Sequence, residues 1–168
     1  MNIPAVPRID EHTTLVRAGV GEVWQALLET LEDSFGRART ARYARLVGAA
    51  DRAVSGPRPL AEGSAFPGFR VAAARPGREL VLIGRHHFST YALIFRLDTT
   101  GDGRVRLRAE SRARFPGHGG AVYRLLVIGT GAHATGVRHV LATVRRRALK
   151  GRGERRDQPP PARGQDAT

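Results

Sequence analysis

The clearest pattern in the chain is a two-residue alternation between Arg104 and Phe115. Apolar or small residues occupy every second position of this run, and arginine or glutamate occupies most of the positions between them. Successive side chains of a β-strand point to opposite faces, so the run predicts a strand with one apolar and one charged face. Such strands are typical of an antiparallel sheet that is covered on one side only.

The same reasoning predicts further strands upstream of this run. They are expected at residues 11–18, 69–75, 79–87 and 89–98, where β-branched and apolar residues are frequent. The tetrapeptide Arg75-Pro76-Gly77-Arg78 has the composition of a tight turn, which predicts a hairpin. The strands therefore form a meander.

Residues 20–35 have a helical period instead. Their apolar side chains recur at three- and four-residue steps, which is the spacing of one buried helical face. A second short helix is predicted at 41–49, with Tyr43, Leu46 and Val47 turned inward. Two short helices thus follow the first strand.

One continuous helix is predicted from about Pro116 to Leu149. Four-three spacing places a mainly apolar stripe on it, made of Val122, Leu126, Gly129, His133, Val137, Val140 and Val144. The stripe is expected to close over the apolar face of the sheet. The fold class is therefore α+β, with a flexible N-terminus (1–10), one domain (11–149) and a disordered, basic, proline-rich tail (150–168).

The formal net charge of +13 raises the question of a polyanionic partner. Lys150 is the only lysine among 28 basic residues, and the arginines are dispersed with few aromatic residues between them. Single-strand binders use aromatic stacking platforms, so no specific nucleic-acid partner is expected. Weak association with an anionic membrane or RNA is expected through Arg145 to Arg156. The sequence leaves the oligomeric state open.

The chain contains no cysteine, which excludes disulfides and thiolate metal sites. Its first residues lack the basic and apolar regions of a secretory signal, and no apolar run reaches the length of a membrane span, so a cytoplasmic protein is expected. The string Gly117-His118-Gly119-Gly120 lacks the spacing and the lysine of a phosphate-binding loop. No cofactor and no metal site are predicted.

The order of elements resembles the START-like superfamily, which includes the birch-pollen-allergen fold and the polyketide cyclase or dehydrase group, also called SRPBCC proteins. The segment LVRAGVGEVWQALLETLED, a strand leading into a helix with a Val-Trp pair, is similar to the opening of that family. The runs FPGFRV, PGRELVLIGRHHFSTYALIFRL and RLRAESRARFPG resemble its strand region. The resemblance covers about residues 11–148.

This resemblance implies a helix-grip fold, in which a curved sheet wraps around the C-terminal helix and leaves a cavity between them. Members of the superfamily use the cavity for lipids, steroids, polyketides or plant hormones, and fold alone selects none of these. We therefore expect binding of a small hydrophobic ligand such as a lipid or polyketide. The alternatives are an enzyme of the cyclase, aromatase or dehydrase kind, and a protein that contacts anionic surfaces through its basic tail.

The candidate catalytic residues are His133, His87 and Tyr91. His133 lies on the apolar stripe of the last predicted helix, where it serves either a ligand carbonyl or a neighbouring protein group. His87 shares the cavity face with Tyr91 only if the strand continues unbroken past Phe88; otherwise His87 lies at an exposed strand end. The residues expected to contact the ligand are Trp24, Leu93, Phe95, Leu107, Ala109, Leu126, Gly129, His133 and Val137.

Glu110 is flanked by Arg108 and Arg112 on the charged face of its predicted strand. We interpret these side chains as a solvated ladder of ion pairs rather than as a catalytic group, because that face alternates away from the apolar one.

Overall fold

Six strands form one antiparallel sheet in the computed structural model, which describes residues 6–36 and 38–156. The strands are β1 (Arg8–Val16), β2 (Ala65–Phe66), β3 (Phe69–Arg75), β4 (Glu79–His86), β5 (Ser89–Thr99) and β6 (Val105–Arg114). Their order in the sheet is β1-β6-β5-β4-β3-β2, so the first strand pairs with the last and the others follow as a meander. The alternation on β6 is confirmed, since Val105, Leu107 and Ala109 are buried and Arg106 is exposed.

Two helices separate β1 from the other strands, as the sequence predicts. Helix α1 (Val20–Phe35) buries Val23, Trp24, Leu27 and Leu31, which is the predicted apolar face. Helix α2 (Ala38–Leu46) begins and ends earlier than expected. The inward position predicted for Leu46 is wrong, because Leu46 is the last residue of α2 and is 83% exposed.

The predicted continuous C-terminal helix is broken. It consists of α3 (Gly117–Arg124), the π-helical turn η2 (Leu125–Gly129) and α4 (Ala132–Arg156). Gly131, between η2 and α4, has φ of 72°, a left-handed conformation that glycine adopts without a steric penalty. A π-turn inserts a residue into the helical repeat, so the stripe before the break and the stripe after it face different directions.

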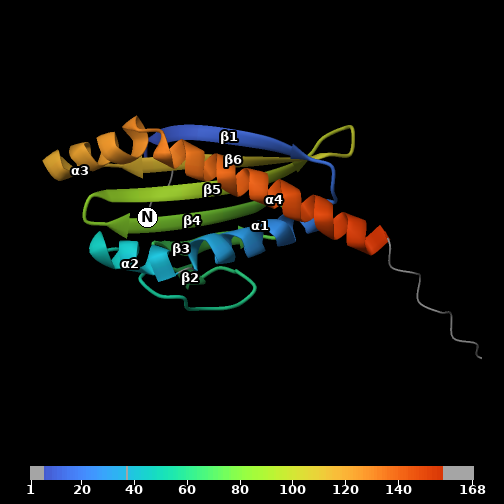
Figure 1. Cartoon of the computed structure of the whole chain (residues 1–168), viewed down its shortest axis with the longest axis horizontal. Coiled ribbons are helices and arrows are strands. Elements are labelled where there is room, and N and C mark those ends of the chain that lie inside the picture. The colour runs from blue at the N-terminus through green and yellow to red at the C-terminus, as the bar shows by residue number, and fades with distance from the viewer. Residues whose placement is uncertain (1–5, 37, 157–168) are drawn as a thin grey trace, which may run out of the picture.

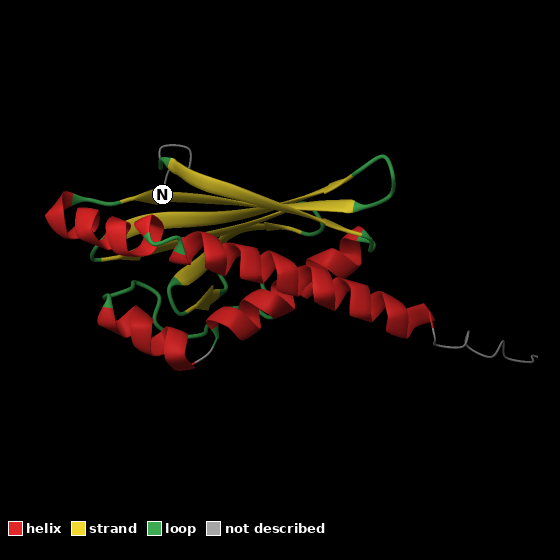
Figure 2. Cartoon of the chain, turned by 45° about the horizontal axis from the view of Figure 1, so that its top comes forward, coloured by secondary structure: helices red, strands yellow, loops and turns green. Residues whose placement is uncertain are grey.

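The packed core lies where α1 and α4 cross the same face of the sheet (Figure 2). From α4 it receives Val137, Val140, Leu141, Val144 and Ala148, all of them buried. The sheet contributes large side chains from three neighbouring strands, namely Leu80 and Leu82 from β4, Phe95 and Leu97 from β5, and Val105 and Leu107 from β6. The four-three spacing of the second half of the predicted helix is therefore confirmed.

The opposite face of the sheet carries the charged residues of β6. Glu110 accepts hydrogen bonds from Arg96 at 2.7 Å and from Arg112 at 2.6 Å, while Arg108 bonds to Asp98. The predicted ladder is thus corrected: Glu110 is not solvated but only 6% exposed, and Arg96 replaces Arg108 as its partner. Burial alone would raise the pKa of Glu110, but the hydrogen bonds from the two guanidinium groups outweigh it and lower the pKa.

The regular secondary structure extends further toward both ends of the described chain than the sequence predicts. Strand β1 begins at Arg8, before the predicted start at residue 11, and α4 continues to Arg156, beyond the predicted end at Leu149. The rest of the predicted tail, residues 157–168, lies outside the described residues. Within the described part of the chain, every helix is too short or too polar to cross a bilayer.

Candidate functional site

A cavity of about 210 Å³ lies at the end of the sheet where α2 and α3 are found (Figure 1). Its floor is formed by inward-facing residues of β3 to β6, and its walls by α2, η2 and the first turn of α4. Apolar side chains dominate the lining, among them Val47, Phe69, Leu93, Val127 and Ile128. The cavity thus lies beside the packed core rather than within it.

Several floor positions on β5 and β6 carry small residues, where the packed core has large ones. Ser89 and Ser111 are buried on the cavity face of β5 and β6, and Ala113 follows Ser111 on the same face. The helix break at Gly131 moves the apolar residues of η2 away from the line of α4. The small residues on the floor and the displacement of η2 together leave the space that forms the cavity.

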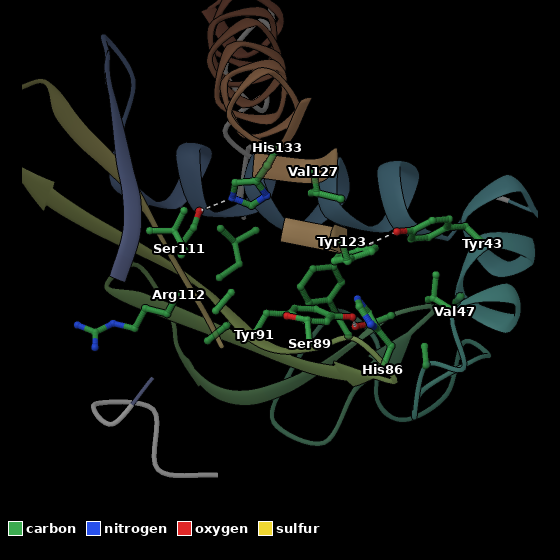
Figure 3. A pocket seen from close by; sticks show the side chains of 18 of the residues that line it. Tyr43, Val47, His86, Ser89, Tyr91, Ser111, Arg112, Tyr123, Val127 and His133 are labelled. Carbon is green, nitrogen blue, oxygen red and sulfur yellow. Dashed lines mark hydrogen bonds between the residues drawn. The ribbon is translucent and has the colours of Figure 1, made fainter. Parts of the chain in front are cut away.

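One end of the cavity contains the best-organised polar group of the site. His133 Nε2 lies 2.8 Å from Ser111 Oγ, and Figure 3 shows the two side chains pointing toward each other. Asp10 Oδ1 lies 3.7 Å from the same ring nitrogen, and Asp10 Oδ2 lies 3.3 Å from His12 Nε2. Within the described residues Asp10 Oδ1 is buried without a hydrogen-bond partner.

This arrangement is not the catalytic triad of a serine hydrolase. In a triad the carboxylate binds Nδ1 of the histidine and the serine binds Nε2, which orients the ring between them. Here Ser111 and Asp10 both approach Nε2 of His133. The geometry suits recognition of a hydroxyl or carbonyl group, or proton exchange with one.

The protonation state of His133 follows from its surroundings. Burial lowers its pKa, and the nearby imidazole of His12 lowers it further, while the Asp10 carboxylate acts in the opposite direction. The lowered pKa keeps the ring neutral near pH 7. A neutral imidazole can both donate and accept a hydrogen bond, which a protonated one cannot.

His86, Tyr91 and Tyr123 form an aromatic cluster at the other end of the cavity. The His86 ring lies 5.4 Å from the Tyr91 ring and 4.8 Å from the Tyr123 ring. His86 Nδ1 accepts a hydrogen bond from the Phe88 backbone N–H at 3.2 Å, so the neutral ring has its proton on Nε2. Burial, and then the neighbouring His87, lower the pKa of His86.

The two tyrosines are held by their hydroxyl groups. Tyr91 donates to the Gly68 carbonyl at 2.6 Å, and Tyr123 on α3 shares a hydrogen bond with Tyr43 on α2 (Figure 3). Burial raises the pKa of both Tyr91 and Tyr123, so both hydroxyls stay protonated over the physiological range. The Tyr43–Tyr123 bond joins the two helices that flank the cavity.

A close backbone approach permits this position of Tyr91. A Cβ atom on Gly84, the residue opposite Tyr91 on β4, would lie 2.3 Å from the Gly68 carbonyl oxygen and 2.3 Å from the Tyr91 ring. No real side chain fits there. Gly84 is therefore the position where only glycine lets the phenol lie flat on the sheet and reach Gly68.

Three of the predicted site residues line the cavity, and the others do not. His133, Tyr91 and Leu93 all contribute to its lining. The cavity position expected of His87 is wrong, because β4 ends at His86 and a turn at His87–Phe88 leaves His87 exposed. His86 occupies the cavity instead, since neighbouring residues of a strand point to opposite faces.

The other residues predicted to contact a ligand lie elsewhere. Trp24, Phe95, Leu107, Ala109 and Val137 belong to the packed core under α1 and α4 and are absent from the cavity lining. Leu126 and Gly129 lie on the outer side of η2, where Leu126 is 61% exposed. The π-turn explains the outward positions of Leu126 and Gly129. Val127 and Ile128 take the inward positions that the four-three spacing gave to these two residues.

Sequence reasoning missed the contributions of Asp10, Ser111 and His86. A signal existed for Ser111, which is the one hydroxyl residue on the inward face of β6. No comparable signal marks Asp10, which comes to His133 through the pairing of β1 with β6. Within residues 6–36 and 38–156 no group of three or more His, Cys, Asp or Glu side chains is placed to bind a metal ion.

No family model and no curated protein matches the sequence. Among solved structures, Ara h 8.0201 matches with a TM-score of 0.52 and 7% identity over 87% of this chain and 99% of that one. CalU16 from Micromonospora echinospora matches with a TM-score of 0.49 and 16% identity, over 84% of this chain and 82% of that one. A conserved protein from Geobacillus kaustophilus matches with a TM-score of 0.49 and 14% identity, over 83% of this chain and 94% of that one.

Identities this low establish similarity of fold and nothing finer. The fold of this chain matches that of Ara h 8.0201 over nearly the whole length of that protein. The chain therefore has the helix-grip fold, as its order of elements predicts.

Proposed function

We propose that the protein binds a small, mainly apolar molecule that carries one hydroxyl or carbonyl group. The observation that supports this proposal is the cavity itself, in which an apolar lining encloses the polar pair of His133 and Ser111. Ligand sites in proteins typically combine an apolar wall with a few convergent polar groups. The apolar wall supplies affinity through burial, and the polar pair orients the ligand.

The volume limits the size of the ligand. A cavity of about 150 Å³ lined by apolar side chains takes up benzene, so a cavity of about 210 Å³ suits a molecule of one or two rings. A whole lipid or polyketide exceeds this space. Such a ligand would enter only with its end, or only if η2 moved outward.

Thermal unfolding in the presence of naphthalene and naphthol tests the proposal. A ligand that binds only the folded state raises the melting temperature, and we expect naphthol to raise it more than naphthalene because of its hydroxyl. Ala113→Leu should abolish the effect by filling the cavity, whereas Ala142→Leu, at an exposed position of α4, should leave it intact. If both variants respond like the original protein, the ligand does not occupy this cavity.

A second candidate function is acid–base chemistry of the cyclase, aromatase or dehydrase kind. The observation that favours it is the contact of the half-buried His133 ring, whose pKa is lowered by burial, with a hydroxyl group inside the cavity. A ligand that copurifies with the protein would be identified by native mass spectrometry and then followed over time. A change in its mass that requires His133, and stops in His133→Gln, supports an enzyme; an unchanged ligand supports a binding protein.

A further inference from the structure

The helices beside the cavity expose an unusual amount of apolar surface. Leu46 at the end of α2 is 83% exposed, and Val122, Leu125 and Leu126 on α3 and η2 are 60%, 70% and 61% exposed. Tyr43 on α2 is exposed as well. Single exposed leucines are ordinary, but a group of exposed apolar residues on three elements at one end of a molecule indicates an interaction surface. We call Tyr43, Leu46, Val122, Leu125 and Leu126 the cavity-end surface.

The same end of the molecule is positively charged. Arg42, Arg45 and Arg124 are exposed on these helices. Neither residues 34–50 nor residues 111–153 contain an aspartate or glutamate, and the exposed Arg85 lies on β4 just before the turn to β5. Figure 1 places α2, α3 and this turn together at the end of the sheet opposite the last turns of α4. Apolar and cationic groups thus occur side by side without carboxylates on the same segments.

We propose that the cavity-end surface docks on an anionic lipid bilayer. Leucine and tyrosine side chains would enter the boundary between headgroups and acyl chains, and the arginines would contact lipid phosphates. Each component is weak alone, and interfacial binding combines both. The proposal goes beyond ligand binding, because docking does not depend on what the cavity holds, although it would bring the cavity next to the bilayer.

A bilayer fits this surface better than a second copy of the chain does. In a symmetric dimer the same patch meets itself, which would bring Arg42, Arg45 and Arg124 toward the same arginines of the partner. Like charges across an interface are unfavourable, and no acidic residue of these segments compensates them. Phosphate groups supply the missing negative charge.

The proposal also differs from docking through the basic C-terminal segment. Arg147 on α4 is within salt-bridge distance of both Asp33 and Glu29 of α1, so part of that charge is neutralised within the protein. The two basic regions lie at opposite ends of the molecule (Figure 1). Their contributions can therefore be separated by substitution.

Sedimentation with phosphatidylcholine vesicles, with and without phosphatidylglycerol, tests the proposal on the full chain. We expect binding to the anionic vesicles and little to the neutral ones. Arg42→Gln/Arg45→Gln should weaken binding about tenfold or more, whereas Arg145→Gln/Arg146→Gln, which removes the same charge from α4, should weaken it much less. Leu46→Ser/Leu126→Ser should also weaken it about tenfold, and Leu149→Ser, at an exposed leucine of α4, should not.

Three results would overturn the proposal. They are absence of binding to anionic vesicles, a larger loss from the α4 arginine variant than from the α2 variant, and a concentration-dependent dimer that Leu46→Ser/Leu126→Ser abolishes. None of the substituted residues lines the cavity. The naphthol response of the same variants should therefore stay unchanged, so a failure of docking is distinguishable from a failure of ligand binding.

Discussion

The two ends of the sheet differ in how the same three strands are used. Toward α1, β4, β5 and β6 present Leu80, Phe95 and Leu107, and α4 closes over them in a packed core. Toward α2 the same faces present Gly84, Ser89 and Ser111, and the roof is the displaced turn η2. One end therefore provides stability, and the other provides space.

The largest expected effect comes from shortening a side chain at each end. Leu107→Ala in the packed core should lower the free energy of unfolding by about 2–5 kcal/mol, because the fully buried side chain leaves a void. Leu93→Ala should cost clearly less, because Leu93 already borders the cavity. Denaturant unfolding measures both. Equal costs would mean that the space beside Leu93 is filled in solution.

A matched pair of glycine substitutions sharpens the comparison next. Gly84→Ala should destabilise the protein by roughly 1–3 kcal/mol, because the new methyl group overlaps the Gly68 carbonyl and the Tyr91 ring. Gly136→Ala on α4 meets no atom within 4 Å and should stabilise the helix by about 0.4–1 kcal/mol. Thermal unfolding should therefore show a lower melting temperature for Gly84→Ala and a higher one for Gly136→Ala. A neutral Gly84→Ala would show that Tyr91 does not lie against β4.

The cavity end should also carry a pH dependence that the packed core lacks. The pKa of His133 is lowered by burial, so the unfolded chain takes up a proton first as the pH falls below about 6.5. Stability is thus expected to fall between pH 6.5 and the lowered pKa of the folded state, and to be constant with respect to this group above pH 6.5. His86 acts in the same direction.

His133→Gln isolates this contribution, because glutamine does not titrate. Denaturant unfolding of the variant from pH 7.5 to pH 5 should show a shallower loss of stability than the original protein, with His86 responsible for part of what remains. An unchanged slope would place the His133 ring in water rather than against Ser111.

The smallest effect is expected at the end of α2. Leu46→Ser should change the free energy of unfolding by no more than about 0.5 kcal/mol, because the leucine is almost fully exposed. Val47→Ala, one residue later and buried, should cost roughly 1 kcal/mol or more. Denaturant titration separates the two. A larger loss of stability for Leu46→Ser than for Val47→Ala would mean that Leu46 points inward, as the sequence predicts.

The sequence predicts the packed end far better than the cavity end. On β6 and α1 most residues of the apolar period are buried, because the spacing of residues along a regular strand or helix determines the face on which each side chain lies. Around the cavity the spacing of residues predicts the wrong face in two places. The π-turn at Leu125–Gly129 shifts the helical phase. The turn after His86 breaks the strand phase, so His86 rather than His87 shares the face of Tyr91.

The polar pair of the site was only half predictable for a different reason. His133 stands out as a polar residue within an apolar stripe, so its position could be inferred from α4 alone. Its surroundings depend on β1 and β6, which bring Asp10 and Ser111 to it from distant parts of the chain. Spacing along one element contains no information about such contacts.

Methyl NMR spectra during a titration with naphthol show directly which end of the sheet takes up the ligand. We expect shifts at the cavity end, for Val47, Leu93, Ala113, Val127 and Ile128, and little change for Leu82, Leu107 and Val144 in the packed core. Shifts confined to the packed core, or no shifts at saturating naphthol, would contradict this expectation.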